Sequence, residues 1–169
     1  MTYALVAYGS SHGSTADIAD WIGETLRERG IRVDVSDAAT VEDVSHYDLV
    51  VLGGALYAHR WQRQARRFAR RHRTALLARP VWLFSTGPLD RSAEGAVIAP
   101  VPQVARIAER ISARGHSTFG GRLAPDTTGF LARRMARTMA GDFRNRAQVT
   151  AFAYGIAAEA ARPDVDAVR

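Results

Sequence analysis

The sequence predicts an α/β protein in which helices cover both faces of a parallel β-sheet. Short apolar runs of strand length alternate along the chain with segments in which apolar residues recur at helical spacing. Several of the runs end in loops rich in glycine, serine or threonine, and in open α/β sheets ligands bind at such strand ends. The length of 169 residues fits a single domain over 1–169.

The expected strands are the apolar runs at 3–8, 31–35, 49–52, 81–84 and 117–120. The expected helices cover 15–29, closed by Gly30, then 61–76, then 104–111, ended by Gly115, and a last long helix with Asn145 as its N-cap. The polar stretch 37–48 is expected to hold one helical turn at 41–44.

Two residue types are missing from the sequence. It contains no cysteine, and all 23 basic residues are arginine because there is no lysine. The first absence excludes disulfides, thiolate nucleophiles, Cys-liganded zinc and Cys-held iron–sulfur clusters. The second excludes a Schiff base and a Walker-type phosphate loop. Demanding chemistry therefore has to come from histidines, carboxylates, hydroxyls or a bound cofactor.

The net charge of +6 favours acidic partners, since arginine stays protonated at physiological pH. The apolar run 3–8 is too short for a signal peptide or a membrane span, so a cytoplasmic location is expected by default. His46, His72 and His116 are scattered and expected to be surface or structural residues. The carboxylates do not cluster either, so we expect no metal site.

The first candidate site is the loop between the run 3–8 and the following helix. It combines four hydroxyls with glycines at a helix N-terminus, an arrangement suited to binding phosphate. A plain strand-to-helix turn capped by one hydroxyl is the alternative. The spacing fits neither a Walker motif nor G-x-G-x-x-G, so ATP and dinucleotides are disfavoured. The site residues are Ser10, Ser11, His12, Gly13, Ser14 and Thr15.

Two further loops follow the third and fourth expected strands, and each taken alone could be an ordinary loop. In the second, small residues would let a ligand approach and aromatic residues follow; it contains Gly53, Gly54, Ala55, Leu56, Tyr57, Ala58, His59, Arg60 and Trp61. The third contains Ser85, Thr86, Gly87, Pro88, Leu89 and Asp90. With the first loop they predict a phosphate at one end and a flat ring system at the other. Gly53-Gly54 also stands where a phosphoacceptor receiver domain needs its aspartate, which argues against that class.

The pattern Ser10-x-His12-Gly13-x-Thr15 resembles the FMN phosphate loop of the flavodoxins, with histidine where threonine is frequent. The stretches 54–59, 84–89 and 141–143 resemble, more narrowly, the flavodoxin-domain family that includes menaquinone-dependent protoporphyrinogen dehydrogenase. That family often has an Asp-Trp pair before the last helix, where this chain has Asn145-Arg146. The resemblance implies a three-layer, doubly wound sandwich with a five-stranded parallel sheet in the order 2-1-3-4-5.

The resemblance further implies FMN, with its phosphate in 10–15 and its isoalloxazine between the second and third loops. FMN would then carry the redox chemistry. Backbone N–H groups of Thr86 and Gly87 are expected to face the pyrimidine edge of the ring. Tyr57 is expected to stack on the ring, or else to be a half-buried loop aromatic. His59 or Arg60 would stabilise negative charge on the reduced ring and raise its potential. A deazaflavin would fit the same site.

Two arginine clusters have open interpretations. The first cluster is expected on the second helix and comprises Arg60, Arg63, Arg66, Arg67, Arg70, Arg71 and Arg73. It is either a solvated face or a surface for an acidic partner, an anionic lipid or a carboxylate-bearing substrate; nucleic acid is not expected, for want of an aromatic platform. The second, at 129–139, is an extra basic helical segment that either caps the sheet or serves an acidic substrate or peripheral contact with the inner face of a quinone-bearing membrane.

The leading hypothesis is an FMN-dependent oxidoreductase of the protoporphyrinogen dehydrogenase type, which passes two electrons from a porphyrinogen-like substrate through flavin to a quinone. A one-electron carrier for a redox protein is the second hypothesis. A flavodoxin-like interaction module without flavin is the third.

Overall fold

The computed structural model describes every residue except 11–12, 88–96, 124–140, 143 and 163–169. Its main sheet contains the parallel strands β1 (Tyr3–Gly9), β2 (Arg32–Asp37), β3 (Leu49–Tyr57), β5 (Val81–Thr86) and β6 (Gly115–Phe119). Their order across the sheet is β2-β1-β3-β5-β6. Counted as the five expected strands, this is the order 2-1-3-4-5, so the predicted doubly wound α/β class and strand order are confirmed.

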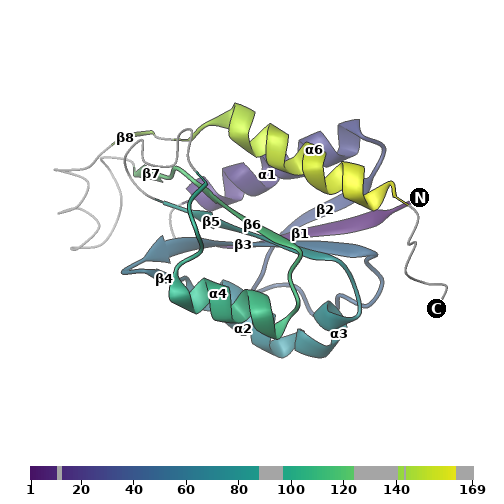
Figure 1. Cartoon of the computed structure of the whole chain (residues 1–169), viewed down its shortest axis with the longest axis horizontal. Coiled ribbons are helices and arrows are strands. Elements are labelled where there is room, and N and C mark those ends of the chain that lie inside the picture. The colour runs from purple at the N-terminus through teal and green to yellow at the C-terminus, as the bar shows by residue number, and fades with distance from the viewer. Residues whose placement is uncertain (11–12, 88–96, 124–140, 143, 163–169) are drawn as a thin grey trace.

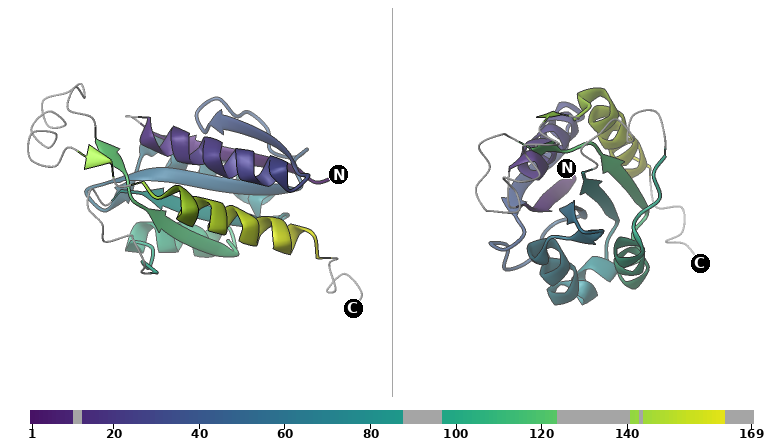
Figure 2. Two further views of the ribbon diagram at one scale, coloured as in Figure 1. Left: turned by 90° about the horizontal axis from the view of Figure 1, so that it is seen from above. Right: turned by 90° about the vertical axis from the view of Figure 1, so that its left-hand side faces the viewer.

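Helices cover the sheet on both faces, which gives three layers (Figure 1). On one face, α1 (Ser14–Glu28) and α6 (Arg146–Ala160) lie side by side (Figure 2). The other face carries α2 (Arg63–Arg71), α3 (Arg73–Leu77) and α4 (Pro102–Arg110).

The alternation of side chains along β1 builds both halves of the core. Ala4 and Val6 enter the cluster beneath α1 and α6, while Leu5 and Ala7 enter the cluster on the α2 and α4 side. All four are fully buried. A strand covered on both faces has no solvent-facing positions, so it is apolar at consecutive residues. This is why the run at 3–8 could be recognised.

The prediction of one continuous helix over 61–76 is wrong in two respects: the helix starts later, and it is divided into two. Arg60 and Trp61 form β4 (Arg60–Trp61), which pairs antiparallel with the end of β3. The helix is then interrupted at His72, between α2 and α3. His72 is buried, its ring centroid lies 4.7 Å from that of Phe68, and its Nε2 lies 3.3 Å from the Val41 carbonyl oxygen. These tertiary contacts hold the ring at the break between the helices.

Other boundaries also differ from expectation. The run at 49–52 continues as a strand to Tyr57, and no helical turn forms at 41–44. Gly115 begins β6, whereas α4 already ends at Arg110. A short antiparallel pair, β7 (Arg122–Leu123) and β8 (Gly141–Asp142), precedes α6 and was not foreseen.

Asn145 is the N-cap of α6, as predicted. Its side-chain oxygen accepts a hydrogen bond from the Gln148 N–H at 3.3 Å. The expected basic segment at 129–139 lies outside the described residues, so its position relative to α6 stays a prediction.

Candidate cofactor site

Three chain segments meet at the carboxyl edge of the sheet, where β1, β3 and β5 end. The strand register pairs Gly9 with Gly54, and Gly54 with Ser85, so the three predicted loops leave neighbouring strands at the same level. The strand order reverses at β1, where β2 lies on one side and β3 on the other. Ligands of doubly wound sheets bind at this position.

The loop from β1 into α1 places backbone donors at a helix N-terminus. Gly13 is the N-cap and has φ +85°, a left-handed conformation that glycine adopts without steric cost. Its N–H donates to Ser10 Oγ at 3.1 Å, and the Asp17 N–H donates to the Gly13 carbonyl as the first bond of the helix. The N–H groups of residues 14–16 therefore have no acceptor within α1, and this end of the helix suits an anion.

One of the four hydroxyls predicted to bind phosphate, that of Thr15, makes a structural contact. Thr15 and Thr86 are both buried, and their Oγ1 atoms lie 2.6 Å apart. The pair ties the first turn of α1 to the end of β5, so the first and third loops are joined directly. Ser14 is partly exposed at the start of the helix. Ser11 and His12 lie outside the described residues.

The glycines of the second loop make room for the protein's own aromatic rings. A Cβ on Gly53 would lie 1.9 Å from Phe84 Cζ, and a Cβ on Gly54 would lie 2.7 Å from Trp61 Cγ. The absence of a side chain at these two positions is therefore used by Phe84 and Trp61, and the approach of a ligand to this segment stays a prediction. Ala55 and Leu56, which follow them, are half-buried.

Ser85 is the centre of a buried polar network. Its hydroxyl oxygen accepts a hydrogen bond from Trp61 Nε1 at 2.8 Å and lies 2.9 Å from His116 Nε2. This links β4, β5 and β6, so the side chain predicted to contact a cofactor holds three strands together. Burial lowers the pKa of His116 to about 4, and the ring is neutral near pH 7. Its Nδ1 is buried without a hydrogen-bond partner in the described part of the chain.

The structure also constrains the third loop. The Gly87 N–H donates to the Phe119 carbonyl at 2.9 Å, so the prediction that it faces the pyrimidine edge of a flavin is wrong for this group. Gly87 has φ +101°, a backbone conformation that favours glycine. The role expected of the Thr86 N–H stays a prediction, and Pro88, Leu89 and Asp90 lie outside the described residues.

The second loop is a β-hairpin with a two-residue turn. Leu56 pairs with Trp61 and Tyr57 with Arg60, which leaves Ala58 and His59 as the turn. These two have φ +47° and +60°, as a type I′ turn requires. The Tyr57 side chain is 44% exposed at this edge, and His59 and Arg60 are exposed beyond it. The hairpin thus presents an aromatic ring and two basic side chains, and their contact with a cofactor stays a prediction.

Arg144 is a residue that the sequence reasoning missed. Its guanidinium binds Asp142 in a two-pronged arrangement, with Nε 2.8 Å from Oδ1 and an Nη 2.7 Å from Oδ2, and reaches Asp17 at 2.6 Å. It also lies 5.0 Å from the Trp21 ring centroid. The arginine therefore fastens β8 to the first turns of α1. Asp17 is 127 positions away in sequence, so no local pattern could have signalled the contact.

A doubly wound sandwich with a glycine- and serine-bearing helix N-terminus at the switch point defines a flavodoxin-like protein. The family model described as "Flavodoxin domain" matches residues 5–145, and the chain belongs to that family. FMN is the cofactor that this membership implies. Proteins of this kind transfer electrons to redox partners. The backbone donors of 14–16 and the Ser10 and Ser14 hydroxyls fit a phosphate group.

Solved structures agree on the fold. The structure resembles oxidised flavodoxin 2 from Bacillus cereus with a TM-score of 0.64, 19% identity, and coverage of 94% of this chain and 99% of that one. An NADH:FMN oxidoreductase in its apo form gives a TM-score of 0.63 and 13% identity over 96% and 92% of the two chains. At these identities the likeness shows the fold alone.

A similarity in sequence extends to one named enzyme. The chain is 27% identical over 92 residues to protoporphyrinogen IX dehydrogenase [quinone] of Escherichia coli K12. The match covers 53% of this chain and 51% of the enzyme, so it spans about half the length of that relative.

No group of three or more His, Cys, Asp or Glu side chains in the described part of the chain is placed to hold a metal ion. Among the same residues, no helix has the length and hydrophobicity needed to cross a bilayer.

Proposed function

We propose that this flavodoxin-domain protein is an FMN-dependent oxidoreductase of the protoporphyrinogen dehydrogenase type. It would take two electrons and two protons from an organic substrate such as a porphyrinogen and deliver them to a quinone, which becomes the quinol. The observation that carries the proposal is the sequence match to an enzyme of that name, together with a site suited to FMN.

Some residues of the site would bind FMN, and others would adjust the reduction potential of its ring. The loop 10–15 holds the FMN phosphate, Tyr57 stacks on the isoalloxazine, and FMN supplies the redox chemistry when bound. His59 and Arg60 lie at the tip of the hairpin that carries Tyr57. A positive charge about 4 Å from the ring is worth about 1–4 kcal/mol to a negatively charged reduced form, which favours accepting a pair of electrons.

The proposal is tested by anaerobic mixing of the FMN-loaded protein with protoporphyrinogen IX, followed by a soluble menaquinone analogue. We expect the visible flavin absorbance to bleach on the first addition and to return on the second. A flavin spectrum that stays unchanged through both additions would exclude this activity.

A one-electron carrier is the second candidate, favoured by the likeness to solved flavodoxins. Reductive titration separates the two candidates. A carrier takes up its two electrons in well-separated steps at different potentials, whereas the proposed dehydrogenase passes to the fully reduced form in one step.

A further inference from the structure

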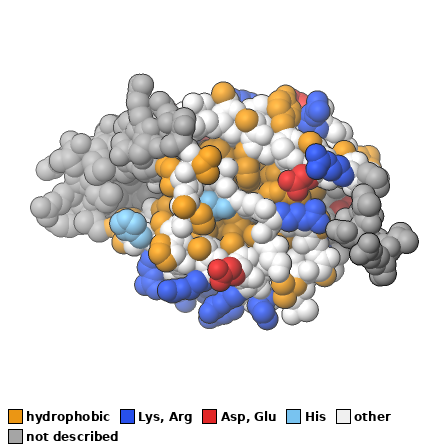
Figure 3. All heavy atoms as spheres, viewed as in Figure 1, with side chains coloured by type: hydrophobic (Ala, Val, Ile, Leu, Met, Phe, Trp, Pro, Cys, Tyr) orange, Lys and Arg blue, Asp and Glu red, His pale blue; other side chains and the backbone are white. Residues whose placement is uncertain are grey.

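The groove between α2 and α4 is a second feature of the molecule that suits an anion. It has a volume of about 540 Å³ and lies on the face of the sheet opposite α1 and α6 (Figure 1). The space-filling view shows arginine side chains gathered over these helices (Figure 3). Seven arginines line the groove: Arg63, Arg66, Arg67, Arg70, Arg73, Arg106 and Arg110.

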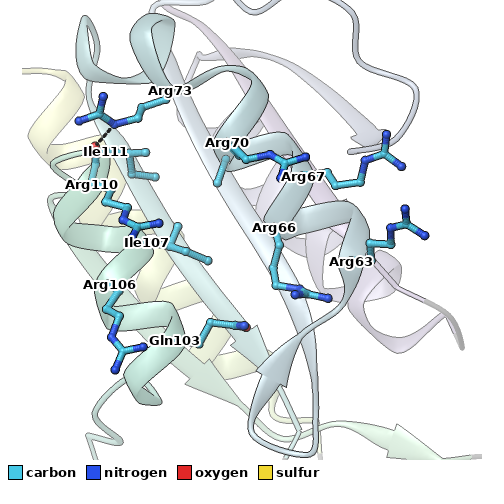
Figure 4. A pocket seen from close by; sticks show the side chains of 11 residues that line it. Arg63, Arg66, Arg67, Arg70, Arg73, Gln103, Arg106, Ile107, Arg110 and Ile111 are labelled. Atoms are coloured by element: carbon cyan, nitrogen blue, oxygen red, sulfur yellow. Dashed lines mark hydrogen bonds between the residues drawn. The ribbon is translucent and has the colours of Figure 1, made fainter.

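The arginines reach the groove from both walls. Arg66 and Arg70 come from α2, and Arg106 and Arg110 come from α4, as the close view shows (Figure 4). Between them lie apolar side chains such as Ile107. An anion placed in the groove would therefore interact with cations on two sides. The expected interpretation of the first arginine cluster, as one face of one helix, missed the contribution of α4.

Within the described part of the chain these charges are not neutralised. No carboxylate of those residues lines the groove, and none of the groove's arginines forms an ion pair with them. Arg66 Nε is buried and has no hydrogen-bond partner among those residues. A charged group with an unsatisfied donor gains from an acceptor, so a ligand anion in contact with the Arg66 guanidinium would be stabilising.

The density of charge indicates the class of ligand. Helix α2 runs from Arg63 to Arg71 and is about 12 Å long at 1.5 Å per helical residue. A peptide of that length supplies about four charges even if every residue is acidic, since extended residues span about 3.3–3.6 Å each. Terminal phosphate groups carry about −1.5 to −2 each and diester phosphates about −1, so about four to seven of them would neutralise the seven arginines. Guanidinium groups also match phosphate oxygens in a two-pronged geometry.

We infer that the groove between α2 and α4 is a binding site for a ligand that carries three or more phosphate groups, separate from the FMN phosphate loop at α1. The groove is concave, which favours a compact ligand over a flat surface. No aromatic side chain lines it, so it offers no platform for stacking bases as single-stranded nucleic acids require. Soluble oligophosphates and the clustered headgroups of anionic lipids share the required chemistry.

Calorimetric titration of the FMN-saturated protein with inorganic tripolyphosphate tests the site, because FMN then fills the other phosphate site. We expect one tripolyphosphate per chain. The triple variant R66Q/R70Q/R106Q should bind at least about tenfold more weakly, since one charged hydrogen bond is already worth that factor. The control R29Q/R32Q/R162Q removes the same charge from exposed arginines outside the groove and should stay within about threefold of wild type.

Thermal unfolding and FMN content establish that both variants are folded. Equal weakening in the two variants, or no binding of tripolyphosphate to the wild type, would overturn the inference. FMN retention by a protein that ignores tripolyphosphate would leave the proposed redox function standing, so the two failures are distinguishable.

Co-sedimentation with vesicles distinguishes the sources of phosphate. If lipid is the source, vesicles containing phosphatidylglycerol should sediment the wild type, vesicles of phosphatidylcholine alone should not, and tripolyphosphate should release it. If the source is soluble, neither vesicle sediments the protein while tripolyphosphate still binds. A short RNA that binds the same arginines more tightly than tripolyphosphate would contradict the inference and indicate a nucleic-acid surface.

Discussion

Thr15 and Thr86 connect two loops of the candidate site through a single pair of buried hydroxyls. Replacing Thr86 with valine keeps the shape but leaves the Thr15 hydroxyl without its partner, which should lower the free energy of unfolding by about 1–3 kcal/mol. The double variant T15V/T86V should cost less than the sum of the single changes, because both polar groups are gone. Urea denaturation of the four proteins measures this, and strict additivity would show that the hydroxyls do not interact.

His116 should make stability depend on pH. Its pKa is about 4 in the folded protein, against an ordinary value of 6.5. Between these values the unfolded chain binds more protons, so the free energy of unfolding falls as the pH is lowered from 6.5 to 4, by at most about 1.4 kcal/mol per pH unit. H116Q should flatten this dependence. His72, whose pKa burial also lowers, contributes a dependence of the same sign in both proteins. An unchanged slope in H116Q would contradict this assignment.

At the scale of elements, the β3–β4 hairpin places two non-glycine residues in left-handed conformations. The left-handed conformation costs alanine about 1–2 kcal/mol, and histidine tolerates it better. The substitution A58G should therefore stabilise the protein by up to about 1 kcal/mol, and H59G by less. A151G, at an exposed position of α6, should instead destabilise by about 1 kcal/mol. Thermal unfolding of the three variants provides the comparison. Destabilisation by A58G would contradict the turn geometry.

The ion pairs of α1 with the segment around β8 differ in their burial. Arg144 has 10% of its side chain exposed and two carboxylate partners, whereas Arg146 is 60% exposed and pairs with Glu24 at 2.5 Å. Both guanidinium groups lie over Trp21. R144A should therefore cost about 1–2 kcal/mol and R146A about 0.5 kcal/mol or less, measured by chemical denaturation. R144K should recover little, since lysine lacks the fork that Asp142 binds. Equal costs for R144A and R146A would contradict this ranking.

Helices and strands could be predicted from the sequence where the pattern of apolar residues along a short segment reflects which side chains are buried. β1 and β5 are covered on both faces, and the runs 3–8 and 81–84 within them are continuously apolar. The glycine after α1 marks the end of that helix. The β3–β4 hairpin was missed because its turn residues are alanine and histidine, which carry no turn signal. The structural contacts of Gly53, Gly54 and Ser85 could not be predicted, because the sheet brings their partners, Phe84, Trp61 and His116, to them from distant positions in the sequence or from neighbouring strands.

At the scale of the whole molecule, the structure shows where much of the positive charge behind the net charge of +6 lies. Seven of the 23 arginines line the groove between α2 and α4, on the face of the sheet opposite α1, while the hairpin at the carboxyl edge carries His59 and Arg60. The absence of cysteine and lysine agrees with a protein whose reactive group is a cofactor. The phosphate loop and the arginine groove are proposed as separate anion sites, so the two binding functions should be separable by mutation.

The central claim, that FMN binds at the carboxyl edge through the loop 10–15, is tested most directly by titrating FMN with the protein and following the quenching of flavin fluorescence. We predict one FMN per chain and unchanged FMN binding in R66Q/R70Q/R106Q. Binding should be at least about tenfold weaker in S10A/S14A, which lacks two hydroxyls that are predicted to contact the phosphate. Flavin fluorescence that the wild-type protein leaves unaltered, or quenching that S10A/S14A does not weaken, would contradict the claim.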